Sequence, residues 1–272
     1  MKQGVLVVLG HKGSGKSQLT RKFLKQVPRS VCLDTMGEYG GVVIEDPYSL
    51  AEYLEANRRG GFRIAYRDNG QHEDIKPETL FKMLGNLRET WLCLEEASKY
   101  GEAGNSNRMI REARWFIQYG RHYGISVLLV ARRPQEIDRM ATANADTVVS
   151  FVQQEPRDLD YIRQLGGVAA EERIKRLGLY EWDYVVDQHD GIHAVLSSIS
   201  TGESNVGSSD SARLDSDAMG DGGNGARRDG GVVPETEQQG NEGARARNQG
   251  SRSSGVVPES GEAVVGGENV NP

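Results

Sequence analysis

The stretch GHKGSGKS, which runs from Gly10 to Ser17, sets the framework for the whole chain. It follows the apolar run Val5–Leu9 and opens a helix-like segment that continues to Gln26. A strand, a glycine loop and a helix in this order are typical of a phosphate-binding loop. The glycines let successive main-chain N–H groups point into one concavity, and the helix adds its positive end. We therefore predict a nucleoside triphosphate site formed by Gly10, His11, Lys12, Gly13, Ser14, Gly15, Lys16, Ser17 and Gln18.

Two side chains of this loop have distinct expected roles. The Lys16 ammonium would reach the β- and γ-phosphates of ATP, and the Ser17 hydroxyl would bind Mg²⁺. ATP and Mg²⁺ are therefore the expected cofactors. The alternative is a glycine-rich turn before an ordinary helix, and the strand that precedes the loop argues against it.

Charge is distributed unevenly along the 272 residues. From Thr201 onward the chain has six Arg, no Lys and twelve acidic residues, which accounts for the whole net charge of −6. The first 200 residues hold 27 basic and 27 acidic side chains and are neutral. A neutral domain exerts no general attraction on nucleic acid, so any such contact must come from a local patch.

The composition changes near Ser200. Residues 201–272 contain no aromatic residue and one leucine, Leu214. Such a segment buries too little apolar surface to offset the entropy of ordering. We therefore expect a P-loop domain over residues 1–200 and a disordered acidic tail over residues 201–272. The pentapeptide GVVPE occurs twice in this tail, at 231–235 and 255–259, and is either a docking motif or a duplicated patch in a solubilising segment.

The first 200 residues alternate between strand-like and helix-like runs, as in α/β proteins. We expect strands at 4–9, 30–34, 42–44, 62–66, 91–94, 125–130 and 147–152, and a final strand pair at 180–186 and 192–197. We expect helices at 16–26, 50–58, 77–87, 107–122, 134–141 and 156–165. This alternation predicts a twisted, mainly parallel sheet with helices on both faces and a ligand at the carboxyl ends of the strands.

A second catalytic element follows the strand expected at 91–94, which ends in two adjacent carboxylates, Glu95 and Glu96. In hydrolysing P-loop ATPases the first acid of such a pair holds the Mg²⁺ shell and the second polarises the attacking water. We therefore expect Glu96 to be the general base and Glu95 to contact the metal through water. The alternative is an ordinary solvated strand end.

Three further blocks of sequence resemble the HerA–FtsK superfamily of ring-shaped, DNA-pumping ATPases. Residues 120–134, GRHYGISVLLVARRP, are similar to the GR-x-x-GI … TQRP block of that superfamily. Residues 34–39, DTMGEY, are similar to its D-x-x-GEY block, and EEAS at 95–98 stands where its members have DEAH or a relative. The blocks occur in the order of the superfamily and span residues 4–155. The resemblance implies a RecA-like P-loop core.

The resemblance also assigns a role to an arginine. In the superfamily, the arginine of the GR-x-x-GI block reaches the nucleotide of the neighbouring subunit, which makes Arg121 a candidate arginine finger and Arg114 its substitute. Such a residue neutralises charge that develops on the transferred phosphoryl group. The alternative is a solvated helix face that contains Arg108, Arg111, Arg114 and Arg121.

This chain departs from the superfamily at Arg132, which stands where the TQRP block has a sensor glutamine. A glutamine both donates and accepts hydrogen bonds, whereas an arginine only donates. Arg132 is compatible with a γ-phosphate sensor in the same subunit, or with altered coupling and a slower enzyme.

Residues 99–108 lie between the paired acids and the expected arginine helix, and are polar and rich in glycine. We expect a mobile loop, which in a ring would face the lumen. Lys99 and Arg108 would then contact DNA phosphates without reading the sequence. An idle surface loop is the alternative.

These features favour a compact, oligomeric ATPase that moves double-stranded DNA through a ring, with a hexamer as the expected oligomer. The size resembles that of viral genome-packaging ATPases of this superfamily, and the tail would then bind a virion or portal-vertex protein. A nucleotide-dependent assembly or secretion factor is the first alternative, and a small-molecule kinase is the second. No run approaches the roughly 20 apolar residues of a membrane span, and no cleavable leader precedes the first strand. We therefore expect a cytoplasmic protein, in the host cytoplasm or at a virion vertex if it is viral.

Overall fold

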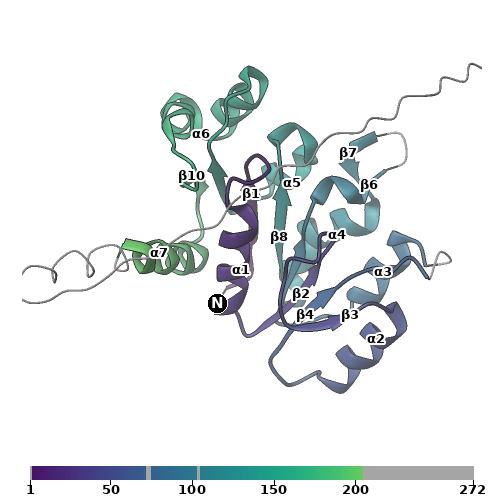
Figure 1. Ribbon diagram of the computed structural model, residues 1–272. Coiled ribbons are helices and arrows are strands. Elements are labelled where there is room, and N and C mark those ends of the chain that lie inside the picture. The colour runs from purple at the N-terminus through teal and green to yellow at the C-terminus, as the bar shows by residue number, and fades with distance from the viewer. Residues whose placement is uncertain (1, 72–74, 103–104, 205–272) are drawn as a thin grey trace, which may run out of the picture. The chain divides into compact units, whose positions relative to one another are not determined.

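The computed structural model describes residues 2–71, 75–102 and 105–204 (Figure 1). The expected tail therefore lies outside the described residues, apart from 201–204. These four residues continue the last helix, and the domain boundary expected at 200 stays a prediction. Among the described residues, no helix is both long and apolar enough to cross a lipid bilayer.

Most strands join one sheet in the order β10-β9-β1-β8-β5-β2-β4-β3. These strands are β1 (Val5–Leu9), β2 (Arg29–Leu33), β3 (Val42–Ile44), β4 (Phe62–Tyr66), β5 (Thr90–Leu94), β8 (Ile125–Ala131), β9 (Thr147–Phe151) and β10 (Trp182–Asp187). All neighbouring pairs are parallel except β9 and β10, which are antiparallel. The predicted α/β class with a mainly parallel sheet is confirmed.

Helices cover both faces of this sheet (Figure 1). They are α1 (Lys16–Gln26), α2 (Pro47–Ala56), α3 (Pro77–Leu84), α4 (Arg111–Tyr119), α5 (Arg139–Ala143), α6 (Pro156–Arg176) and α7 (Asp190–Ser204). Three short 3₁₀ helices connect them to the strands: η1 (Ala97–Tyr100), η2 (Gly120–Tyr123) and η3 (Pro134–Glu136). Every residue of β1 is buried, because side chains alternate between the two faces of a strand and both faces are covered.

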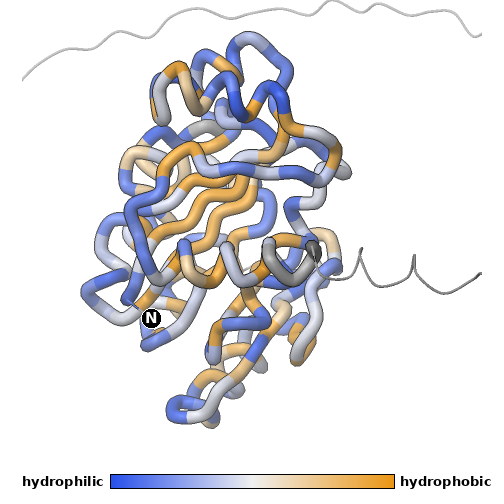
Figure 2. Tube along the Cα trace, turned by 90° about the vertical axis from the view of Figure 1, so that its left-hand side faces the viewer, coloured by the Kyte–Doolittle hydropathy of each residue, from blue (hydrophilic) through white to orange (hydrophobic). Residues whose placement is uncertain are grey.

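The two apolar clusters follow this alternation. Val5, Val7 and Leu9 pack with α2, α3, α4, α5 and α6 on one face. Leu6 and Val8 pack with α1 and α7 on the other. The orange strands in the interior of Figure 2 are these doubly covered strands. The sheet is therefore a rigid support for the loops that leave its carboxyl edge.

The strand predicted at 192–197 is wrong, because residues 190–204 form α7. Ile192, Leu196 and Ile199 are buried and recur at helical spacing, which the branched residues between them obscured in the sequence. The His189 ring accepts a hydrogen bond from Ile192 N at 3.1 Å and so caps the first turn. β10 consequently pairs with β9 and not with a following strand.

The helices expected at 50–58 and 77–87 are Pro47–Ala56 and Pro77–Leu84 in the structure, and three other predicted helices differ more. The helix expected at 107–122 begins at Arg111, because residues before it form β7 (Asn105–Met109). The helix expected at 134–141 is divided into η3 and α5, since Asp138 accepts a hydrogen bond from Met140 N and starts a new helix. The helix expected at 156–165 extends to Arg176 across a break at Gly167, which has a φ of 80°.

Candidate nucleotide-binding and catalytic site

The predicted phosphate-binding loop connects β1 to α1. Gly10, Gly13 and Gly15 have φ angles of 157°, 81° and 107°, a region that side chains with a Cβ rarely adopt. A Cβ at Gly10 would lie 2.7 Å from both Phe151 Cβ and Ser14 Oγ, so the loop has no room for a larger residue there. The sequence therefore forms a curled backbone at this position that only glycine permits.

The Lys16 ammonium is held by the loop itself. Lys16 Nζ donates a hydrogen bond of 2.7 Å to the main-chain oxygen of His11. Burial lowers the pKa of Lys16, and the nearby Glu96 carboxylate opposes that shift. The lysine thus already lies across the concavity where phosphate is expected.

The other predicted loop residues occupy consistent positions. Gly10 and Ser14 are buried, Lys12, Gly13 and Gln18 are exposed, and His11, Gly15, Lys16 and Ser17 are intermediate. Leu19 N donates to Gly15 O at 3.0 Å, which places Ser17 in the first turn of α1. The expected contact of the Ser17 hydroxyl with Mg²⁺ stays a prediction.

Three neighbouring parallel strands bring the predicted catalytic groups to one edge of the sheet. β8 pairs with β1 on one side and with β5 on the other, with Ala131 opposite Leu9 and Leu129 opposite Leu94. The phosphate-binding loop follows β1, the paired acids follow β5, and Arg132 follows β8. The carboxyl edge of the sheet therefore collects all of them, as the sequence predicted.

The candidate general base, Glu96, is paired with Arg132. Arg132 Nη2 lies 2.9 Å from Glu96 Oε1, and Arg132 Nε donates to Glu96 Oε2 at 3.3 Å. Glu96 has φ 56° and ψ 65°, an unusual conformation for a residue other than glycine. This contact between Glu96 and Arg132 was not predicted from the sequence, because it depends on the pairing of β5 with β8.

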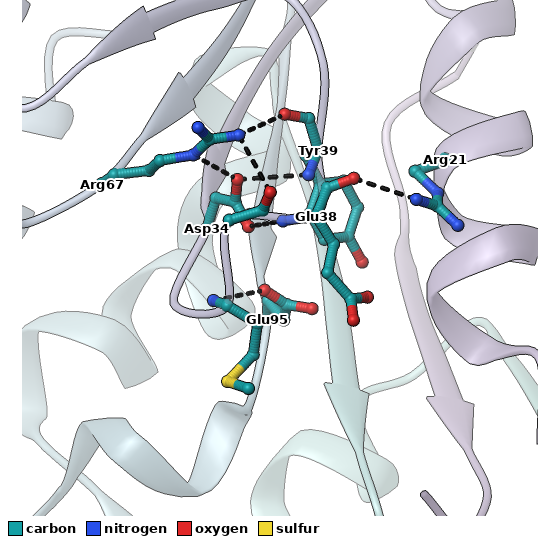
Figure 3. Close-up of polar contacts among 8 residues, drawn as sticks. Arg21, Asp34, Glu38, Tyr39, Arg67 and Glu95 are labelled. Atoms are coloured by element: carbon teal, nitrogen blue, oxygen red, sulfur yellow. Dashed lines mark hydrogen bonds and ion pairs between the residues drawn. The ribbon is translucent and has the colours of Figure 1, made fainter. Parts of the chain in front are cut away.

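The preceding acid, Glu95, points toward the turn that follows β2 (Figure 3). Its side chain is buried, and Oε2 accepts a hydrogen bond of 3.2 Å from Met36 N. Burial raises the pKa of Glu95 to about 7, with the nearby Asp34 carboxyl adding to the shift. The expected contact of Glu95 with Mg²⁺ through water stays a prediction.

The GEY block forms a turn around the buried carboxylate of Asp34 (Figure 3). Asp34 accepts hydrogen bonds from Glu38 N at 2.9 Å and from Tyr39 N at 3.1 Å. Arg67, which follows β4, donates from Nε to Asp34 at 2.8 Å and from Nη2 to Tyr39 O at 2.9 Å. Sequence reasoning missed Arg67, whose one signal is its position directly after a strand that ends at the same edge.

Arg121 lies at the opposite edge of the sheet from the phosphate-binding loop. It belongs to η2, which precedes the amino end of β8, whereas the loop leaves the carboxyl end of the parallel β1. A five-residue strand is about 16 Å long, so Arg121 does not reach the nucleotide site of its own chain. Arg114, the suggested substitute, lies 3.6 Å from Asp138 and lines a different cleft.

The segment expected to be a mobile loop contains an antiparallel hairpin, β6 (Gly101–Glu102) with β7, and residues 103–104 lie outside the description. The hairpin separates the two proposed DNA contacts. Lys99 borders a small cleft beside Asp34, whereas Arg108 borders a cleft of about 630 Å³ between β7, α5 and α6. This second cleft, called the arginine cleft below, is lined by four arginines, Arg108, Arg114, Arg139 and Arg157, and by the acids Asp138 and Asp160.

Comparison with known proteins gives structural relatives but no sequence relatives. No protein-family model matches the chain, and no curated protein sequence matches it. The structure is similar to that of the genome packaging NTPase B204 from Sulfolobus turreted icosahedral virus 2. The sulfate complex of that protein gives a TM-score of 0.55 at 19% identity and covers 70% of this chain and 94% of B204. Its AMP complex gives 0.54 at 20% identity, over 67% and 92% of the two chains.

A further B204 structure, in complex with the nucleotide analogue AMPPCP, gives a TM-score of 0.53 at 19% identity. It covers 67% of this chain and 91% of B204. The match covers nearly the whole of each B204 chain. This chain therefore has the P-loop NTPase fold that its resemblance to the HerA–FtsK superfamily implied.

Proposed function

We propose that this chain is an ATPase that moves double-stranded DNA as part of a ring, in the manner of a viral genome-packaging motor. The proposal rests on one observation: the phosphate-binding loop, Glu95 and Glu96 lie at the same edge of the sheet. An acid pair beside a P-loop supports hydrolysis rather than binding alone. The fold of the B204 packaging NTPase supports the assignment to packaging.

Each residue at this edge has a defined task in the proposed reaction. The loop N–H groups and Lys16 hold the phosphates, and Glu96 accepts the proton of the attacking water. Ser17 and, through water, Glu95 would hold Mg²⁺, which neutralises charge that develops on the phosphates. The pairing of Lys16 with a loop carbonyl supports this arrangement, because the phosphates need only replace one neutral acceptor.

The position of Arg121 supports a site shared between subunits. Since this side chain lies at the edge opposite its own loop, an arginine finger at this position acts on a neighbouring subunit. Head-to-tail contacts of this kind close into rings when the rotation permits. We propose a hexamer, in which each subunit supplies Arg121 to the next.

The arginine cleft is the proposed contact for DNA. Four arginines and two aspartates line it, although the domain as a whole is neutral. Asp138 is also occupied, because it accepts hydrogen bonds from Met109 N and Met140 N. Among the described residues, neither Arg139 nor Arg157 forms an ion pair, so both are suited to neutralise phosphates without reading bases.

The test is ATP hydrolysis by the full chain with and without duplex DNA. We expect duplex DNA to raise the rate, and Lys16→Ala to abolish it. The pair of substitutions Arg139→Glu and Arg157→Glu should remove the stimulation while leaving hydrolysis without DNA. Arg58→Glu with Arg176→Glu is the matched control, since it changes the same charge on exposed arginines elsewhere.

The outcomes separate the candidate functions. A rate that is identical with and without duplex would exclude the motor and favour a nucleotide-dependent assembly or secretion factor. Transfer of phosphate to a small molecule would favour a kinase. Stimulation that survives the charge reversal would place the DNA contact outside the arginine cleft. In the packaging role, the chain acts in the host cytoplasm or at a virion vertex, where residues 201–272 bind a vertex protein.

A further inference from the structure

The ion pair of Glu96 with Arg132 occupies the carboxylate that the proposed reaction needs. Both oxygens of Glu96 face the guanidinium, at 2.9 Å from Nη2 and 3.3 Å from Nε. Ser98 Oγ also lies 3.5 Å from Oε1. A carboxylate accepts a proton from water only through a free lone pair directed at that water. In this arrangement Arg132 takes a lone pair of each Glu96 oxygen and competes with an attacking water for the carboxylate.

Arg132 stands between the base and the phosphate-binding loop. It follows β8, the strand that separates β1 from β5 in the sheet. Arg132 and Glu96 both act electrostatically on the Lys16 ammonium, with opposite signs. The guanidinium thus lies close to the site that would receive the γ-phosphate. Once ATP is bound, both Glu96 and the γ-phosphate are anionic partners for Arg132.

Glu96 and Arg132 differ in how freely their side chains can move. Glu96 sits in a left-handed backbone conformation next to the buried Glu95, and its side chain is 23% exposed. Arg132 is 52% exposed and carries a long side chain. Partly exposed ion pairs are weak, so a multiply charged phosphate competes with the carboxylate for the guanidinium. Arg132 is accordingly the partner that moves.

We propose that Arg132 is a positioning residue that withholds Glu96 from water in the nucleotide-free site and transfers to the γ-phosphate when ATP binds. This inference rests on the proposed function as an ATPase. Once Arg132 has moved, a water oxygen attacks the γ-phosphorus and its proton passes to Glu96. The bond from that phosphorus to the bridging oxygen breaks, and ADP leaves with the electron pair.

The exchange explains why this chain carries arginine where the superfamily resemblance expects glutamine. A neutral glutamine can donate a hydrogen bond to Glu96 but forms no ion pair with it, so it would hold the carboxylate less strongly. ADP lacks the γ-phosphate and leaves the ion pair of Glu96 with Arg132 in place. Arg132 therefore links release of the base to the presence of a triphosphate.

A double-mutant cycle of nucleotide affinities tests the inference without relying on DNA or on ATP turnover. The affinities of a fluorescent, non-hydrolysable ATP analogue and of fluorescent ADP are measured with Mg²⁺ for the full chain and its variants. Arg132→Ala should weaken the ATP analogue about tenfold and change ADP less than about twofold. Glu96→Gln should tighten the ATP analogue several-fold, because Arg132 no longer has to leave a carboxylate.

The double variant is decisive. When Glu96→Gln is combined with Arg132→Ala, the gain from Glu96→Gln should disappear. Arg176→Ala is the matched control: it removes an arginine from another partly exposed ion pair and should leave both affinities unchanged. Circular dichroism verifies that each variant is folded.

Two results would overturn the inference. One is an equal loss of ATP-analogue and ADP affinity in Arg132→Ala. The other is a gain from Glu96→Gln that persists without Arg132. Failure of the wild-type chain to bind either nucleotide would instead refute the proposed ATPase function, so the two failures are distinguishable.

Discussion

Arg67 donates a hydrogen bond of 2.8 Å to Asp34, whose side chain is fully buried, and so fixes the turn that faces Glu95. The arginine comes from the residue after β4, and the aspartate from the residue after β2. Two neighbouring strands are thereby tied at the edge that carries the site. This link joins the stability of the domain to the geometry of its acids.

Removal of Arg67 should destabilise the domain. Arg67→Ala leaves the buried Asp34 carboxylate without its cationic partner, and we expect a loss of about 2–4 kcal/mol in the free energy of unfolding. Arg58→Ala, which removes an arginine from an exposed pair with Glu55, should change it by less than about 0.5 kcal/mol. Urea unfolding of both variants gives the comparison, and equal stabilities would contradict it.

Gly10→Ala should damage the site through the backbone. The added methyl group would lie 2.7 Å from Phe151 and Ser14, at a φ of 157°. We expect a loss of about 1–3 kcal/mol in stability together with loss of nucleotide binding. Gly60→Ala adds the same methyl group in open space and serves as the control. Retention of wild-type nucleotide affinity in Gly10→Ala would refute the predicted loop geometry.

Stability of the nucleotide-free chain should depend on Glu95 between about pH 4.5 and 7. Burial raises the pKa of Glu95 to about 7 from an ordinary value of 4.5. In this range the folded chain keeps a proton that the unfolded chain has released, so the free energy of unfolding falls as the pH rises. Unfolding curves at pH 5 and pH 8 measure the fall. Glu95→Gln cannot ionise and should show a smaller one, whereas an identical pH dependence would assign the effect to other groups.

Complementation tests whether Arg121 acts on a neighbouring subunit. Glu96→Gln lacks the base and Arg121→Ala lacks the finger, so each variant alone should be inactive. After co-assembly, an Arg121→Ala subunit beside a Glu96→Gln subunit has an intact base and receives an intact finger. Random mixing in equal amounts should restore about one site in four. Continued inactivity of a mixture shown to be co-assembled would exclude a shared site.

Local patterns were sufficient for the elements around the phosphate-binding loop. The helix predicted at 16–26 is α1, because the glycine loop fixes where it starts and Val27, in an extended conformation, ends it. The sequence predicted a ligand at the carboxyl ends of the strands, and the paired acids after β5 and Arg132 after β8 lie at that edge. These inferences need only the sequence pattern within each short segment.

Long-range pairing determined what the sequence did not reveal. The contacts of Arg67 with Asp34 and of Arg132 with Glu96 join residues 33 and 36 positions apart. No local pattern indicates which strands become neighbours. The helix α7 was missed for a different reason: its branched residues favour a strand, and burial against α1 overrides that preference.

Helix α7 covers the same face of the sheet as α1. This has a practical consequence for experiments that shorten the chain. Ile192, Leu196 and Ile199 complete the apolar cluster that contains Leu6 and Val8 of the central strand. A chain cut at residue 188 would lose α7 and leave α1 as the helix that covers this face of β1. A chain cut at 200 would end inside the last turn of a helix, whereas a cut after Ser204 keeps the helix whole. Experiments that ask what the acidic tail does should therefore remove residues 205–272 and nothing before them.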